Sequence, residues 1–146
     1  MKYEEYWPKM LDDLLVLVGT PYKLGSEVLI KDWPPKFLDC SELVELVHAR
    51  QNIPVPDGAR YQWKETYCTG ISRPGDLAFL RRDSAIRPDN PHGIVHVDML
   101  LDEKHIVGAR GKPHGKVVVL PKYVVENNPE FLAAGGWRRF VSLRGS

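Results

Sequence analysis

The chain has no excess charge of either sign, few cysteines and no long apolar run, and each absence excludes a class of protein. The chain has 20 Lys and Arg residues and 19 Asp and Glu residues. This balance gives no positive field that would bind nucleic acid or an anionic membrane, and it favours a small neutral or zwitterionic partner. Two cysteines are too few for a disulfide-stapled secreted framework and suit a reducing compartment. The apolar run 14–18 is too short for a signal-peptide core or a membrane span, so we expect cytoplasmic synthesis without a signal peptide and no membrane insertion.

The length of the chain sets its domain count. With 146 residues, 43% of them apolar, it can bury one core without help from disulfides or metals. We therefore expect a single domain over residues 1–146 and no cofactor.

Helical periodicity occupies the first half of the sequence. Apolar residues at spacings of three and four predict a helix over 3–18, which Gly19 ends. A second helix is predicted from Cys40 to about Gln51, and a third over about 59–66.

After the turn at 73–76 the pattern becomes extended. Strands are predicted at 77–81, 94–100, 105–109 and 116–120, and the segment 137–140 is predicted to add an edge strand. Because helices come first and strands follow, the sequence favours an α+β domain with an antiparallel sheet.

Cys40 occupies a position where a helix is expected to begin. Asp39 reads as the N-cap and Glu42, three residues later, completes a capping box. In the first helical turn, unpaired N–H groups and the positive end of the helix dipole favour a thiolate over a thiol.

A histidine lies on a predicted strand further along the chain. His96 falls within the extended segment 94–100, and an imidazole is the usual partner of a nucleophilic sulfur. Cys40 and His96 together therefore predict a cysteine hydrolase. A zinc site built on His92 and His96 is disfavoured, because about 13 Å of strand separates residues four apart.

Structural interpretations stand beside these functional ones. Cys68 has no basic or imidazole neighbour in the sequence and reads as a packed or surface thiol. Asp39 is interpreted as a helix cap, as a substrate-binding group, or as both if each carboxylate oxygen takes one role.

Four blocks of the sequence together resemble a known family. They are Gly19-Thr20-Pro21-Tyr22 with Gly25, then Asp39-Cys40-Ser41, then Arg73-Pro74-Gly75-Asp76-Leu77-Ala78-Phe79, and finally His96-Val97 before an apolar strand and a turn. Pro56 and Gln62 also match the family pattern. In this order and spacing, over about residues 15–110, the blocks resemble the NlpC-type family of papain-like bacterial cell-wall cysteine peptidases.

The resemblance implies a fold, a site and a substrate. It implies a papain-like α+β fold in which the catalytic helix packs on a small antiparallel sheet, with Cys40 as nucleophile and His96 as its base. It also implies that Tyr22, Asp39 and Ser41 line the substrate cleft, with Asp39 meeting the free amine of a stem peptide. The implied substrate is bacterial peptidoglycan, cut between γ-D-glutamate and a diamino acid.

The sequence departs from the family pattern at two positions. Glu42 replaces a glycine, and brings bulk and negative charge within a turn of the sulfur. The family's third catalytic group, usually histidine, stands twelve residues after the base, where this chain has Gly108. A hairpin closed at 101–103 would set His96 opposite Gly108, and a tighter turn would set it opposite Ala109. Asp98, His114, a water or a backbone carbonyl remain candidates for the missing group.

Three further interpretations follow from these departures and from the architecture. One is a non-catalytic cell-wall-binding or phage-tail assembly module of the same fold. Another is an acyltransferase that uses the same cysteine and histidine. A lone catalytic domain also resembles those that phages and prophages encode, so phage tail proteins are candidate partners. We then expect the domain to reach the cell wall in association with a virion or by another route.

Overall fold

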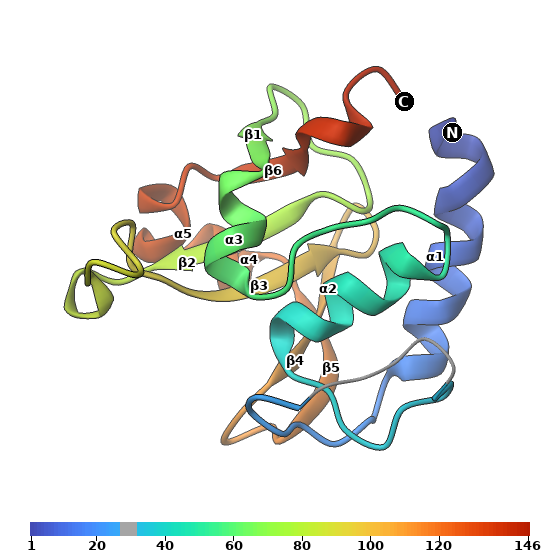
Figure 1. The fold of residues 1–146 in the computed structure, drawn as a ribbon, viewed down its shortest axis with the longest axis horizontal. Helices are drawn as coiled ribbons and strands as arrows, with labels where there is room; N and C mark the ends of the chain where they lie inside the picture. Colours follow the sequence, from blue (N-terminus) through green and yellow to red (C-terminus); the bar gives the residue numbers. More distant parts are fainter. Residues whose placement is uncertain (27–31) are drawn as a thin grey trace.

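The structure, a computed structural model, describes residues 1–26 and 32–146 and has the expected order of helices followed by strands (Figure 1). The helices are α1 (Tyr3–Leu17), α2 (Cys40–Ala49), α3 (Ala59–Lys64), α4 (Tyr123–Glu126) and α5 (Pro129–Ala133), with 3-10 turns at Asp83–Ala85 and Val141–Leu143. The strands are β1 (Thr66–Cys68), β2 (Leu77–Arg81), β3 (Ile94–Leu100), β4 (His105–Arg110), β5 (Lys116–Pro121) and β6 (Trp137–Phe140). The predicted α+β class is confirmed, whereas β1, α4 and α5 were not predicted.

The six strands form one antiparallel sheet in the order β1-β6-β2-β3-β4-β5. The prediction that 137–140 forms an edge strand is wrong, because β6 lies between β1 and β2. Thr66 of β1 pairs with Phe140, and Leu77 of β2 pairs with Arg138. A strand as short as β1 carries too few residues for a periodic signal, so its edge position could not be foreseen.

Alternation along the strands divides the apolar side chains between two clusters. Phe79, Val97 and Met99 belong to the main core, into which α1 and α2 place Leu14 and Val44. A second cluster forms where α4 and α5 pack on other strand residues, with members Ala78, Leu80, Leu100, Ile106, Val125 and Phe131. Figure 1 accordingly has α1 and α5 on opposite sides of the strands.

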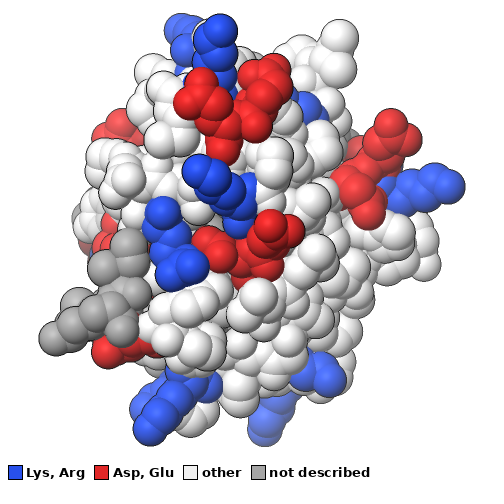
Figure 2. Space-filling view, turned by 90° about the vertical axis from the view of Figure 1, so that its right-hand side faces the viewer, with Lys and Arg blue, Asp and Glu red and all other residues white. Residues whose placement is uncertain are grey.

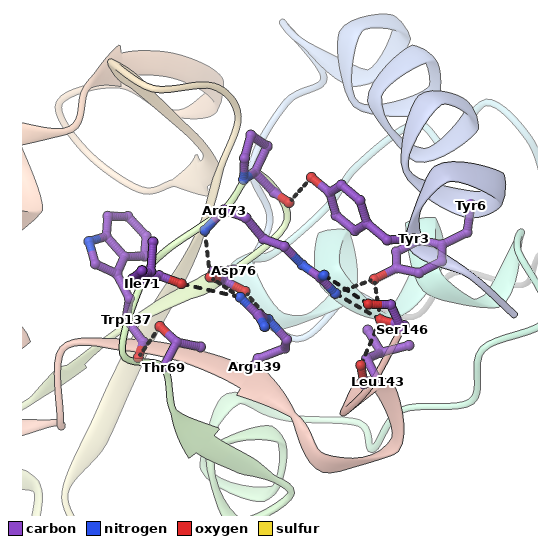
Figure 3. Close-up of polar contacts among 11 residues, drawn as sticks. Tyr3, Tyr6, Thr69, Ile71, Arg73, Asp76, Trp137, Arg139, Leu143 and Ser146 are labelled. Carbon is purple, nitrogen blue, oxygen red and sulfur yellow. Dashed lines mark hydrogen bonds and ion pairs between the residues drawn. The ribbon is translucent and has the colours of Figure 1, made fainter.

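The block at 73–76 builds the turn that leads into β2. Asp76 is buried and accepts two hydrogen bonds from Arg139 of β6, at 2.7 and 2.9 Å, and one from the Arg73 N–H at 2.8 Å (Figure 3). Gly75 needs its positive φ of 99°, and a Cβ there would lie 3.2 Å from the Trp7 ring. This block therefore fixes strand geometry and contributes no group to the site described below.

The same region ties the two ends of the described chain together. The Arg73 guanidinium donates to the hydroxyl groups of Ser146, at 2.7 Å, and Tyr6, at 3.3 Å, while the Tyr3 hydroxyl donates to the Pro74 carbonyl at 2.6 Å (Figure 3). Residues at both ends thus brace the turn before β2.

The surface that carries α1 has acidic and basic side chains side by side, and neither sign dominates this face (Figure 2). Among the described residues, no helix combines the length and apolarity needed to span a membrane.

Candidate active site

Cys40 is the first residue of α2, as the capping pattern predicts. Asp39 has extended backbone geometry and its Oδ1 accepts a hydrogen bond from the Glu42 N–H at 2.9 Å, which confirms it as the N-cap. Cys40 is only partly buried. The residue lies at the end of the helix where backbone N–H groups have no partner within the helix.

The Asp39 carboxylate also organises the loop in front of the helix. Besides the cap, Oδ1 accepts a bond from the Ser41 hydroxyl at 3.2 Å, and Oδ2 accepts one from the Gly25 N–H at 3.2 Å. Since a carboxylate oxygen has two lone pairs, Oδ2 retains capacity for one further donor. The geometry is thus compatible with a capping role and a binding role in one residue.

Glu42 does not complete the capping box in the usual way. Its side chain turns toward the preceding loop, where Oε1 accepts a bond from the Ser26 hydroxyl at 3.0 Å, while Oε2 is buried without a partner among the described residues. Burial first, and then the charge of Asp39, raise the pKa of Glu42 to about 7, although the Ser26 bond opposes the rise. Near neutral pH the negative charge close to Cys40 is therefore only partial.

Tyr22 and Gln62 surround the start of α2. Burial, and then the charges of Cys40 and Asp39, raise the pKa of Tyr22, which places its hydroxyl in the field of both groups. Gln62 is fully buried and its Nε2 donates to the Ser41 carbonyl at 2.9 Å and to that of Pro56 at 3.0 Å. Gln62 therefore anchors α3 and the preceding loop to the first turn of α2.

His96 lies on β3 directly after a β-bulge. Leu80 pairs with His96 but the next residue of β2, Arg81, pairs with Ile94, so Val95 has no partner on β2. Bulges of this kind redirect the neighbouring side chains. The bulge thus contributes to the orientation of the imidazole.

The electrostatic surroundings of His96 favour its charged form. Burial alone would lower the pKa of His96, but the charge and hydrogen bonding of Asp98, followed by those of Cys40, outweigh it and raise the pKa to about 10. At neutral pH the ring therefore favours the imidazolium form, within the electrostatic influence of Cys40. The structure thus brings together the two residues from which the sequence predicts a cysteine hydrolase.

Asp98 lies next to Nε2 of the His96 ring. Its Oδ1 lies 2.9 Å from His96 Nε2, which is an ion-pair distance, but the ring N–H does not point at this oxygen. Its Oδ2 accepts a 2.6 Å hydrogen bond from Arg110 Nη2. The side chain of Asp98 is completely buried. Although burial would raise the pKa of this carboxyl, His96 and then Arg110 hold it below its usual range.

Both predicted registers of the β3–β4 hairpin are wrong. Met99 pairs with Val107 and Leu100 with Ile106. Extended along both strands, this offset would set Gly108 opposite Asp98 and Arg110 opposite His96. The connection is longer than expected because Asp102 Oδ1 accepts bonds from the N–H groups of residues 104 and 105, both at 2.8 Å. Arg110 was missed for this reason, since only the correct register brings its guanidinium to Asp98.

The other sequence candidates lie apart from this cluster or beside it. The His92 ring packs on Trp63, with centroids 4.4 Å apart, and no group of residues suited to a metal ion occurs within the described ranges. His114 lies beyond β4 and lines the same cleft as His96. Cys68 is exposed, which confirms the interpretation as a surface thiol, and Arg138 Nη1, which is distant in the sequence, lies 3.3 Å from its sulfur. Strand pairing between β1 and β6 creates that contact.

No family model and no curated protein matches the sequence, whereas solved structures match its three-dimensional arrangement. The P60 domain of an antigen from Mycobacterium avium subspecies paratuberculosis aligns with 94% of this chain and 96% of its own, at 21% identity and a TM-score of 0.70. A Staphylococcus aureus protein described as similar to lipoprotein, NLP/P60 family, aligns with 97% of this chain at 22% identity and a TM-score of 0.68. The peptidoglycan hydrolase RipB of Mycobacterium tuberculosis aligns with 83% of this chain at 22% identity and a TM-score of 0.58.

This chain has the NlpC/P60 fold. The fold implied by the four sequence blocks is therefore confirmed. The chain spans 43% of the Staphylococcus protein and 62% of the RipB chain.

Within the NlpC/P60 fold of this chain, a cleft of about 270 Å³ lies beside His96. Leu80 and Val95 form part of its apolar lining, whereas Arg82, Arg110 and Lys112 supply basic groups. Arg82 is paired with Glu130 and Arg110 with Asp98. The cleft therefore joins the imidazole to a surface of mixed apolar and basic character, on which the two arginines are already neutralised by carboxylates.

Proposed function

We propose that this protein is a cysteine peptidase that hydrolyses peptide bonds in peptidoglycan stem peptides. The observation that carries the proposal is a histidine whose Nε2 lies 2.9 Å from a fully buried carboxylate and whose pKa responds to a partly exposed cysteine at a helix N-terminus. The NlpC/P60 fold, shared with the peptidoglycan hydrolase RipB, supports the choice of substrate.

In the proposed reaction, Cys40 Sγ forms a bond to the carbonyl carbon of the scissile peptide. Backbone N–H groups at the start of α2, including that of Cys40, stabilise the oxyanion. The His96 imidazolium gives its proton to the departing amine as the C–N bond breaks. Water then attacks the thioester while His96 takes its proton, and the C–S bond breaks to release the acid and restore the Cys40 sulfur and the His96 imidazolium.

The substrate is proposed to be a stem peptide cut between γ-D-glutamate and a diamino acid. The remaining lone pair on Asp39 Oδ2 is available to the free amine at the peptide's start, and Tyr22 and Ser41 flank that position. Lys112, in the lining of the cleft beside His96, is proposed to bind a carboxylate of the substrate.

Digestion of purified sacculi tests the proposal. The wild-type protein and Cys40→Ala are incubated with sacculi, and new peptide termini are identified by mass spectrometry. Wild type should release fragments ending in γ-D-glutamate, and Cys40→Ala should release none above background. Cys68→Ser, which alters an exposed thiol outside the site, is the matched control and should act as wild type. Equal digestion by Cys40→Ala, or no new termini with wild type, would refute the proposal.

Alkylation separates the peptidase from a non-catalytic module. The experiment uses the Cys68→Ser background, because Arg138 lies close enough to Cys68 to influence its reactivity. Iodoacetamide should modify Cys40 faster at neutral pH when His96 is present than in His96→Ala. Equal rates would favour a binding module of the same fold. Product analysis with added amines would reveal an acyltransferase instead of a hydrolase.

The Asp39 assignment has its own test. Acetylation of the free amine of a stem peptide should abolish turnover, because the carboxylate then loses its charged partner. Equal cleavage of the acetylated and free peptides would contradict this role for Asp39.

A further inference from the structure

Asp98 occupies the space that a side chain at position 108 would need. A Cβ added to Gly108 would lie 1.8 Å from Asp98 Oδ1 and 2.9 Å from its Cγ, distances at which no such contact is possible. Oδ1 is also the atom that lies 2.9 Å from His96 Nε2. The carboxylate therefore fills the place from which a residue at 108 would approach the imidazole.

We propose that Asp98 is the positioning residue of His96, with Gly108 kept free of a side chain to admit it and Arg110 holding it in place. This inference rests on the proposed peptidase function. It replaces a third group on β4 by one on β3, two residues from the histidine itself. From the sequence alone, Gly108 indicates the loss of a catalytic group. In the structure, the absence of a side chain at this position leaves the space that the Asp98 carboxylate occupies.

The burial of Asp98 supports this role. A fully buried carboxylate is retained only when charged or hydrogen-bonding partners compensate its lost hydration. Arg110 binds Oδ2, and Oδ1 is left to face His96 alone. The groups that face one another are thus Cys40 from α2, His96 and Asp98 from β3, and Arg110 from β4.

The off-axis contact between Asp98 and His96 is compatible with positioning. Hydrogen bonds of catalytic groups are often poorly aligned before the substrate binds. Because Nε2 of His96 lies next to Asp98, only Nδ1 of the ring is left to interact with the Cys40 sulfur. The carboxylate would therefore select the tautomer and stabilise the imidazolium that the reaction uses.

The conservative variant Asp98→Asn keeps the size of the side chain and removes its charge. We expect kcat/KM on a stem peptide to fall at least about 10-fold, since an orienting carboxylate contributes up to about 10⁴-fold in comparable sites. The carboxylate raises the pKa of His96, so its loss should also move the alkaline limb of the pH–rate profile to lower pH, by about one unit or more. A purely structural role would lower the rate without moving this limb.

A reciprocal exchange tests the vacancy directly. Gly108→His and Asp98→Gly should each lose activity, while the double variant, in which the imidazole enters the space left by the carboxylate, should recover at least about 10-fold over either single variant. Gly108→Ala should also be impaired by the clash with Asp98. Gly70→Ala is its matched control, because a Cβ at Gly70 meets nothing within 4 Å.

The outcomes distinguish this inference from the proposed function. If Cys40→Ala is inactive but Asp98→Asn keeps the wild-type rate and pH profile, Asp98 has no positioning role and the peptidase proposal stands. If Cys40→Ala is as active as wild type, the peptidase proposal itself is refuted. Should the Asp98 variants not fold, an NMR titration of His96 in the wild-type protein decides the matter. A ring that titrates at its ordinary pKa would overturn the inference, and one well above it would support it.

Discussion

Glu42→Gln should stabilise the protein at alkaline pH and have little effect in acid. The carboxyl is 5% exposed, accepts one bond from Ser26 and leaves Oε2 unpartnered among the described residues. Burial and the charge of Asp39 raise its pKa from 4.5 to about 7 in the folded state. The folded protein therefore keeps a proton that the unfolded chain has already lost, so this group's contribution to stability falls as the pH rises from 4.5 to about 7 and stays low above that range.

The magnitude follows from the size of the shift. One pKa unit corresponds to about 1.4 kcal/mol, which gives about 3 kcal/mol as an upper bound for this group. Solvent screening and relaxation around a side chain next to a loop reduce this, so we expect a gain of about 1–2 kcal/mol for the neutral glutamine at pH 8. For a chain of this length the gain corresponds to roughly 3–6 °C in melting temperature.

Thermal unfolding followed by circular dichroism at pH 4, 6 and 8 measures the effect. The difference in Tm between Glu42→Gln and wild type should grow with pH, because only the wild type must ionise a buried carboxyl. Glu103→Gln, at an exposed position in the β3–β4 turn, is the matched control and should give a small difference at every pH. A Glu42→Gln gain that is the same at pH 4 and pH 8 would show that the buried charge is not its cause.

Three further variants probe the frame around the site. Asp76→Asn leaves Arg139 without its buried anion and should cost about 3–5 kcal/mol in urea unfolding, and a loss below about 1 kcal/mol would contradict the bracing role of this pair. Burial lowers the pKa of His48 to about 4, so the free energy of unfolding of the wild type should decline by at most about 3 kcal/mol as the pH falls from 6.5 to about 4. Chemical denaturation of His48→Gln should show a smaller decline over the same pH range. A decline equal to that of the wild type would exclude His48 as its source. Gln62→Ala removes the two bonds that anchor the first turn of α2 and should cost about 2–3 kcal/mol by calorimetry, whereas a melting temperature equal to wild type would mean that these bonds are dispensable.

Two ionisable groups near Cys40 differ in the charge that they favour. Asp98 favours the imidazolium form of His96, whereas an ionised Glu42 would add a negative charge beside the first turn of α2. The raised pKa of Glu42 reduces that negative charge below about pH 7. The glutamate that replaces the family's glycine at position 42 is therefore only partly ionised at neutral pH, and it places less negative charge near Cys40 than the sequence alone indicates.

Local patterns in the sequence were sufficient for the elements that hold Cys40 and His96. The N-cap at Asp39 and the start of α2 are fixed by side-chain bonds within three residues, so their signal is contained in a short segment. The alternation along β3 likewise identifies both ends of the strand that holds His96. Together with the four spaced blocks, these signals predicted the fold and the candidate pair.

Only the tertiary structure decided which groups surround that pair. The side chain of Asp102 lengthens the hairpin turn, and the resulting register differs by one residue from the nearer expected one. This register brings Arg110 to Asp98 and sets Gly108 beside the carboxylate. Pairing of β1 with β6 likewise brings Arg138 to Cys68. Strand register depends on turn geometry and on contacts between residues distant in the chain, and neither is encoded in the period of a single strand. The sequence by itself determined the nucleophile's helix and the base's strand, while the packing of the sheet determined the partner of the histidine.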